Sequence, residues 1–314
     1  MKAAIPSLPH VLSGARHVIA DEKAGRLSYY VDGPDATDCQ QPPMLLLHSI
    51  NASPSAHEIK PLFDAYKTSR RTYALDLPGF GHSERSDRPY RQSLMVDAIV
   101  AVLDRIRKEN QDLAVDILAV SLSCEFVAKV ALQAPQAVRS LAMVSPTGMA
   151  KITKTHGPPE ADCGMPGLYR ALRLPLFGRS LFRLLTAEPT IRFFLRKTWG
   201  SRDIDEEMFR YSLQMCRFPG AHHAPFCFVG GFLFSADIPS IYKALTHPVW
   251  LSHGVRGDFT DFSRAGSIAG EPNWKTTVFE TGALPYFEVT EEFTRAYDEF
   301  LRLVAEGTAV NTGA

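Results

Sequence analysis

The stretch that decides the fold is LAVDILAVSLSCEFVAKVALQAP, residues 113–135. Its first part, Val115–Val120, is apolar apart from Asp116, which is typical of a parallel strand covered on both faces. After Ser121 the apolar residues recur at helical spacing until Pro135 ends the run. The stretch therefore predicts a buried strand, a sharp turn carrying a serine, and a helix.

Ser121 has two interpretations. A serine at a strand-to-helix junction is held on a strained backbone with its hydroxyl projecting, and the helix N-terminus behind it offers amide donors to an anion. The local sequence Ala119–Ser123 varies the nucleophile-elbow pattern G-x-S-x-G, with both glycines replaced by other small residues. The alternative is an ordinary strand followed by a helix that a serine caps.

Composition bounds the class of protein. The 314 residues contain 34 Lys plus Arg and 34 Asp plus Glu, so no overall field attracts nucleic acid or an anionic membrane, and we expect neither as a partner. The five cysteines are odd in number and lack CxxC spacing, which favours a reduced, cytoplasmic protein. We identify no signal peptide and no run long enough to span a bilayer.

Strand and helix patterns alternate along the chain, which predicts an α/β fold with a mostly parallel, twisted sheet flanked by helices. We expect an N-terminal leader over residues 1–26, a core made of 27–147 and 242–305, a helical insertion over 148–241 and a flexible tail over 306–314. Strands are expected at 27–31 (an antiparallel edge strand), 44–47, 72–77, 115–120, 138–144, 249–252 and 275–279. Helices are expected from about 53, over 95–106, from 122, and over 291–304.

No cofactor or metal site is evident in the sequence. It contains no nucleotide-binding fingerprint, and the pair His222-His223 has no carboxylate or cysteine at ligand spacing beside it, so a surface pair is the simpler interpretation. We expect a small-molecule substrate or ligand, and the sequence leaves the oligomeric state open.

Three further segments carry a resemblance to a known family. They are LLLHSIN (45–51), LDLPGFGHSERSDRPY (75–90) and GALPYFEVTEEF (282–293). Taken in order with the serine turn and the helical insertion, they resemble the α/β-hydrolase superfamily over nearly the whole chain, particularly its capped esterase, haloperoxidase-like and carbon–carbon bond hydrolase members. The resemblance implies the α/β-hydrolase fold with the insertion as a cap.

The resemblance also implies roles for individual residues. Ser121 is the nucleophile, and the backbone N–H groups of Leu122 and Ile50 form the oxyanion hole. Asp258 stands where the family places its acid, with Asp261 as the competing choice. A simple turn residue after Gly257 is the structural alternative for Asp258.

The general base departs from the family pattern. Where the family has its catalytic histidine, this sequence has Ala283, and a methyl group cannot take the serine proton. His253 is the nearest candidate replacement, whereas His48 is expected to be structural.

The resulting prediction is a divergent superfamily member with a degenerate triad, acting on a small ester or related carbonyl compound with an impaired or altered mechanism. The alternatives are a non-hydrolytic ligand-binding protein, a lyase or isomerase using the same pocket, or a hydrolase whose histidine was deliberately replaced to trap a substrate. Departures at Ser49, Ala119, Ser123 and Ala283 favour natural divergence, because a deliberate replacement would change one residue.

Overall fold

The computed structural model describes residues 10–35, 41–151, 158, 160–268 and 270–307. Its centre is an eight-stranded sheet with the order β1-β2-β4-β3-β5-β6-β7-β8. β1 and β2 are antiparallel to their neighbours, and all later pairs are parallel. The strands are β1 Ala15–Asp21, β2 Gly25–Asp32, β3 Met44–Leu47, β4 Thr72–Asp76, β5 Val115–Val120, β6 Val138–Val144, β7 Val249–Gly254 and β8 Trp274–Phe279.

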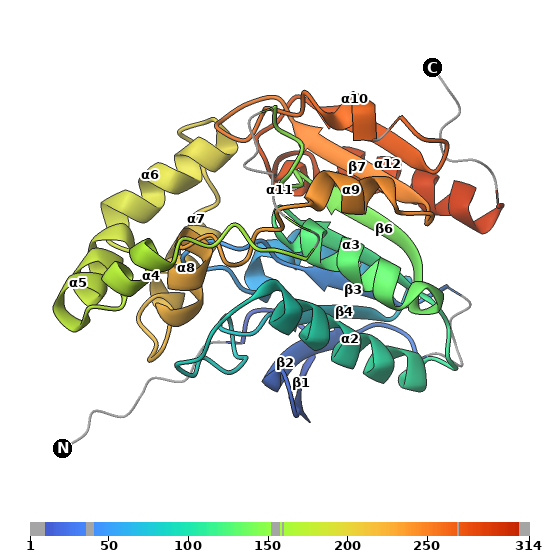
Figure 1. The fold of residues 1–314 in the computed structure, drawn as a ribbon. Coiled ribbons are helices and arrows are strands. Elements are labelled where there is room, and N and C mark those ends of the chain that lie inside the picture. The colour runs from blue at the N-terminus through green and yellow to red at the C-terminus, as the bar shows by residue number, and fades with distance from the viewer. Residues whose placement is uncertain (1–9, 36–40, 152–157, 159, 269, 308–314) are drawn as a thin grey trace.

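Helices cover both faces of this sheet (Figure 1). The helices are η1 Ala56–Ile59, α1 Lys60–Tyr66, α2 Gln92–Glu109, α3 Ser123–Gln133, η2 Pro135–Ala137, α4 Pro166–Leu172, α5 Pro175–Leu185, α6 Glu188–Trp199, α7 Glu206–Met215, α8 His223–Val229, α9 Ile238–Lys243, α10 Ala265–Ile268, α11 Pro285–Glu288 and α12 Thr290–Ala305. Helices α2, α3, α9 and α10 pack on one face of the sheet and form one core with it. Helices α1 and α12 form a second core on the opposite face.

Strand alternation explains the two cores. In β3, Leu45 and Leu47 belong to the core on the α2–α3 side, whereas Met44 and Leu46 belong to the core on the α12 side. All four are fully buried, because successive side chains of a strand point to opposite faces and both faces are covered. The continuous apolar runs of the sequence are thus accounted for, and the predicted α/β fold class is confirmed.

The N-terminal part of the sheet corrects two expectations. Residues 15–21, placed in a leader by the sequence, form β1, and the predicted edge strand at 27–31 is the second strand, paired with both β1 and β4. The residues of β1 are mostly exposed, so its sequence lacks the apolar alternation that reveals a half-buried strand. Residues 1–9 and 308–314, the outer parts of the expected leader and tail, lie outside the described residues.

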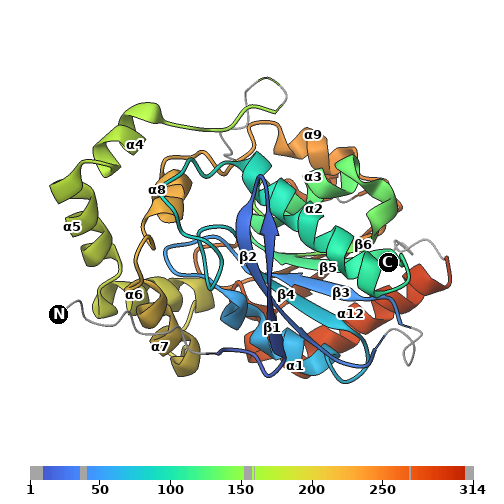
Figure 2. The same ribbon diagram turned by 90° about the horizontal axis from the view of Figure 1, so that it is seen from below.

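Helices α4–α8, which we call the insertion helices, lie between β6 and β7 in the chain and project to one side of the sheet. Figures 1 and 2 both show α4 and α5 at the outer end of this group, farthest from the strands. The insertion returns to the sheet through α9. Among the described residues, none of the helices combines the length and apolar character that crossing a membrane would require.

Asp116 is the polar exception within the buried strand β5. Its side chain is fully buried and accepts hydrogen bonds from Arg70 at 2.9 Å, Arg139 at 2.6 Å and the hydroxyl of Ser140 at 2.5 Å. Arg70 is itself only 5% exposed. The carboxylate therefore bridges two guanidinium groups near the amino ends of β4, β5 and β6.

We expect Asp116→Ala to lower the free energy of unfolding by about 3–5 kcal/mol, because it leaves a buried guanidinium group without its partner. Urea denaturation followed by circular dichroism measures this loss. Glu306→Ala, which removes the exposed ion pair with Arg302, is the control and should cost no more than about 1 kcal/mol. A loss below about 1 kcal/mol for Asp116→Ala would contradict the structural role of this cluster.

Candidate active site around Ser121

Ser121 occupies the turn between β5 and α3 in a left-handed conformation, with φ of 55°. A residue other than glycine adopts this region at a cost, and such strain recurs at functional sites. The Ser121 N–H donates to the carbonyl of Val144 in β6 at 2.8 Å, which holds the turn against the sheet. The side chain is partly exposed rather than packed into the core. The backbone therefore presents the Ser121 hydroxyl at the carboxyl ends of the strands.

Ser123, the second small residue of the expected elbow, forms a hydrogen bond that links two loops. Ser123 is fully buried, and its hydroxyl donates to the carbonyl of His48 at 2.5 Å. His48 ends the run from β3, so this bond joins the serine turn to the segment that follows β3. A glycine at position 123 would lack this bond.

His48 is positioned as a structural, uncharged residue. Its Nε2 accepts from the N–H of Leu77 at 3.1 Å, and its Nδ1 lies 2.6 Å from the carbonyl of Ser49, to which it donates. Both ring nitrogens are therefore occupied in the neutral form. Burial of the ring lowers the pKa of His48 below its usual value. His48 fixes the loops after β3 and β4 relative to each other and has no free nitrogen to act as a base.

The two expected oxyanion donors lie on these same segments. Leu122 directly follows the serine and precedes the first residue of α3, and Ile50 is buried after β3. Within the described part of the chain, neither the N–H of Leu122 nor that of Ile50 donates to another protein group. Unbonded amides beside a projecting serine are what a developing oxyanion requires.

A buried carboxyl group, missed in the sequence, lies behind the Ile50 amide. Glu58 in η1 accepts from the N–H and the hydroxyl of Ser49, each at 2.9 Å, and the amide of Asn51 lies 3.1 Å from the same hydroxyl. Burial raises the pKa of Glu58 to about 7. Ser49, which the sequence resemblance places where a glycine is expected, thus supplies a hydroxyl partner for Glu58. The only sign of Glu58 in the sequence is that an acidic residue stands in a short predicted helix.

Asp76 fixes the loop after β4, the segment LDLPGFGHS. Its buried carboxylate accepts from the N–H groups of Ala56 at 2.8 Å and His82 at 2.9 Å. Gly81 has a φ of 49°, and a Cβ there would lie 2.0 Å from the Asp76 carboxylate. The loop thus needs glycine at this position because the backbone closes directly over a charged side chain.

The loops after β7 and β8 both dock on the C-terminal end of α6. The N–H of Asp258 donates to Lys197 O at 3.1 Å, and the N–H of Ala283 donates to Thr198 O at 2.8 Å. The last carbonyls of a helix have no partner within it, so these two amides complete the end of α6. Gly282, which precedes Ala283, has no room for a side chain there, since a Cβ would lie 2.5 Å from Trp199 O.

The carboxyl groups expected to serve as the acid point to solvent. Asp258 is exposed and pairs with the ammonium group of Lys197 at 3.1 Å. Asp261 is exposed and accepts from the N–H and hydroxyl of Ser263, and these hydrogen bonds lower the pKa of Asp261. The structure thus brings Asp258 and Ala283 to the same helix end, while the Asp258 carboxylate is engaged by a lysine.

Ser121 Oγ makes no hydrogen bond to an imidazole or to any other group within the described residues. His253, the nearest candidate in the sequence, donates from Nδ1 to the carbonyl of Gly254 at 2.9 Å, and its ring stacks on Phe262. Ala283 is buried and supplies only a methyl group. The described part of the site therefore holds Ser121 and the two expected oxyanion donors, without a base bonded to the serine.

A second buried carboxyl group lies one turn into α3. Glu125 accepts from the hydroxyl of Thr147, after β6, and from the N–H of Ser235 at 2.7 Å, where the insertion returns to the core. Burial raises the pKa of Glu125 to about 7. The sequence analysis missed Glu125 because it looks like an ordinary helix residue, and only the fold brings the two partners to it.

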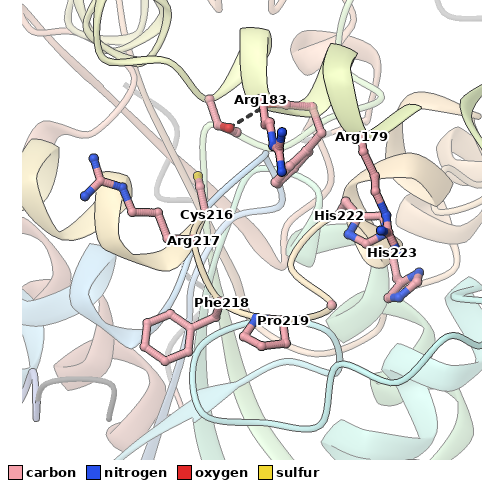
Figure 3. Close-up of a pocket in the computed structure, with 11 residues that line it drawn as sticks. Arg179, Arg183, Cys216, Arg217, Phe218, Pro219, His222 and His223 are labelled. Atoms are coloured by element: carbon pink, nitrogen blue, oxygen red, sulfur yellow. Dashed lines mark hydrogen bonds between the residues drawn. The ribbon is translucent and has the colours of Figure 1, made fainter. Parts of the chain in front are cut away.

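A cavity of about 620 Å³ lies between α5 and the segment that leads into α8. Its volume suits a small organic ligand. Arg179 and Arg183 project from one face of α5, and Figure 3 shows Arg179 beside His222 and His223, with Phe218 and Pro219 opposite. Burial lowers the pKa of His222 to about 4, so this ring is uncharged at neutral pH.

The two arginines that α5 contributes to this cavity lack acidic partners among the described residues. The lining contains no aspartate or glutamate, and neither Arg179 nor Arg183 forms an ion pair with a described carboxylate. Asp87, the nearest carboxylate to His223 at 3.5 Å, is already held by Arg173. The chemistry of the cavity is thus that of a site for an anionic group. The predicted surface pair His222-His223 contributes to its wall.

Comparisons with known proteins agree on one fold. Residues 42–183 match the family model described as alpha/beta hydrolase fold. A probable hydrolytic enzyme from Pseudomonas aeruginosa PAO1 is 18% identical with a TM-score of 0.72, covering 92% of this chain and 95% of that one. The carboxylesterase CesB from Bacillus subtilis is 18% identical with a TM-score of 0.67, covering 92% of each chain.

A loop variant of a haloalkane dehalogenase from Bradyrhizobium elkanii is also 18% identical, with a TM-score of 0.68 and coverage of 93% of this chain and 98% of that one. A search of curated protein sequences finds no match. At such low sequence identities, structural similarity supports a common fold, and the substrate of one protein cannot be assigned to another. With the family model over residues 42–183 and the strand order, they show that this chain has the α/β-hydrolase fold.

Proposed function

We propose that this protein acts on a small ester or related carbonyl compound through Ser121, without a histidine at position 283 to activate the serine. The observation that carries the proposal is the left-handed turn at Ser121, flanked by the unbonded amides of Leu122 and Ile50. Hydrolytic relatives on the same fold, such as a carboxylesterase and a serine hydrolase involved in carbazole degradation, support the reaction class.

The reaction begins with attack of Ser121 Oγ on the ester carbonyl. The Oγ–C bond forms, the carbonyl oxygen becomes an oxyanion facing the two amides, and the serine proton passes to water. Collapse of the intermediate breaks the ester C–O bond, and the departing alkoxide takes a proton from water and is released as the alcohol. Water must then attack the acyl-serine, and this second step also lacks a positioned base. Both steps are therefore slow, and the acyl-enzyme accumulates whenever the leaving group is good.

We expect one acyl group to accumulate on Ser121 when the protein is incubated with p-nitrophenyl acetate, because deacylation lacks a base while the leaving group assists acylation. Intact-mass spectrometry and peptide mapping detect the added acetyl group. Ser121→Ala should abolish the adduct, and Ser93→Ala, an exposed serine on α2, should keep it. An adduct that persists in Ser121→Ala would overturn the nucleophile assignment.

Glu58 should make acylation depend on pH in an unusual direction. Below pH 7 the carboxyl group is neutral, whereas above pH 7 it becomes an anion behind the oxyanion amide of Ile50 and opposes the developing negative charge. The ratio of the wild-type acylation rate to the Glu58→Gln rate should therefore fall as pH rises from 6 to 8. The ratio cancels any pH effect common to both proteins.

Stopped-flow release of p-nitrophenolate measures these rates. Glu207→Gln is the control for a carboxyl group on the neighbouring helix α7, since Glu207 is exposed, and its ratio should stay constant over this range. A constant ratio for Glu58→Gln as well would show that Glu58 does not act on the oxyanion.

A ligand-binding protein is the second candidate function, and the cavity beside α5 favours it. The guanidinium groups of Arg179 and Arg183 lie one helical turn apart and lack acidic partners, so they repel each other until an anion lies between them. The surrounding phenylalanine and proline side chains suit an apolar body. The fitting ligand is a small organic acid.

We expect benzoate to bind this cavity and benzyl alcohol, its uncharged analogue, to bind much more weakly. Replacing both arginines (Arg179→Gln with Arg183→Gln) should weaken benzoate binding by about a hundredfold, since each charge-assisted hydrogen bond contributes about tenfold in affinity. Isothermal titration calorimetry measures both ligands. Arg202→Gln, an exposed arginine outside the cavity, should leave the affinity unchanged. Equal affinity in the double variant and the wild type would contradict an anion site.

A further inference from the structure

The outer surface of the insertion helices is unusually apolar. Fourteen large hydrophobic side chains are exposed in the described chain, and seven of them fall between residues 165 and 194. These seven, which we call the apolar face, are Met165, Leu168, Leu174, Phe177, Leu184, Phe193 and Phe194. A monomeric soluble protein normally scatters such residues singly, so a concentration on three consecutive helices indicates a surface that is covered by a partner.

Helix α5 has its apolar stripe on the side that faces away from the protein. Phe177, Leu181 and Leu184 follow the i, i+4, i+7 spacing of one helix face, and Phe177 and Leu184 are 52% and 65% exposed. The opposite side carries Arg179 and Arg183, which line the cavity. Leu181, between Phe177 and Leu184, is half-buried against the small core that α4, α5 and α8 share, so α5 exposes the two ends of this stripe.

Close contacts with α4 and α8 fix the position of α5. Phe182 packs edge to face on Phe226 of α8 at 6.0 Å and shares a small core with Leu172 of α4. A Cβ at Gly178 would lie 1.7 Å from Leu172 O, so α4 and α5 approach each other as closely as glycine allows. The contacts of α5 with its neighbours thus hold its apolar stripe outward.

Charge in this segment is strongly positive although the whole protein is neutral. Residues 165–199 contain seven Lys or Arg residues and one acidic residue, Glu188, a net charge of +6 (7 − 1), so the rest of the chain carries −6. Arg173, Arg192 and Lys197 pair with carboxylates outside the segment. Arg170 and Arg196 are exposed and form no ion pair within the described residues.

We propose that the apolar face of α4–α6 docks on the surface of an anionic lipid bilayer. Basic helices with exposed phenylalanine and leucine side chains fit the boundary between headgroups and acyl chains, where the apolar groups insert and the arginines contact lipid phosphates. The group projects beyond the sheet in Figures 1 and 2, so a flat surface can reach α4 and α5 without meeting the core.

A second copy of the chain fits this surface less well. A two-fold dimer through the apolar face would bring two basic segments together, and the exposed, unpaired Arg170 and Arg196 of each copy would oppose association. An anionic bilayer supplies the opposite charge over a wide area. This proposal does not depend on the chemistry of Ser121.

Co-sedimentation with vesicles tests the proposal. We expect the full chain to bind vesicles of phosphatidylcholine and phosphatidylglycerol, to bind pure phosphatidylcholine much less, and to release as salt increases. Replacing Phe177 and Leu184 together by serine should weaken binding by at least tenfold, because each apolar side chain loses its burial in the membrane. Arg170→Gln with Arg196→Gln should weaken it by about tenfold or more.

Matched control variants distinguish binding through the apolar face from nonspecific binding to vesicles. Phe259 and Leu132 are exposed to similar degrees outside the insertion helices, and their double serine variant should bind as the wild type does. Arg295→Gln, which changes an exposed residue of α12, should likewise have no effect on vesicle binding. The proposal is overturned if the wild type ignores anionic vesicles or if the Phe177 and Leu184 variant binds them equally. It is also overturned if sedimentation velocity shows a wild-type dimer that this variant dissociates.

Discussion

The abrupt change from strand to helix at Ser121 is the constraint on which the site depends. β5 lies in the middle of the sheet, and α3 begins only two residues after it to cover one face, so Ser121, the first of these two, takes a left-handed backbone. The bond from its N–H to Val144 O and the bond from Ser123 to His48 O tie the turn to both neighbouring strands. The projecting hydroxyl and the free amide of Leu122 follow from the same turn.

The C-terminal end of α6 likewise fixes two loops, those after β7 and β8. Its last carbonyls bond the amides of Asp258 and Ala283, the two positions at which the sequence resemblance led us to expect an acid and a histidine. The insertion helices and the loops after β7 and β8 are therefore one connected unit. The side chains there have other partners, with Asp258 paired to Lys197 and Ala283 limited to a methyl group.

Two buried carboxyl groups fix loops at the carboxyl ends of the strands. Glu58 behind the oxyanion segment and Glu125 beneath the insertion both have pKa values raised to about 7 by burial. Each therefore changes charge near neutral pH. Their hydroxyl partners, Ser49 and Thr147, hold the carboxyl oxygens in place in either state.

The sequence by itself determined the α/β class, the strands from β3 to β8 and the turn at Ser121, because these features depend on local patterns of burial, spacing and backbone geometry. It could not determine β1, whose exposed residues lack apolar alternation, or the partners of Glu58 and Glu125, which come from segments distant in the chain. Only the tertiary structure decided that Asp258 pairs with Lys197 and that α5 turns its apolar stripe outward. The physical reason is that a side chain's residue type limits its chemistry, whereas its neighbours and its exposure depend on how separate segments pack.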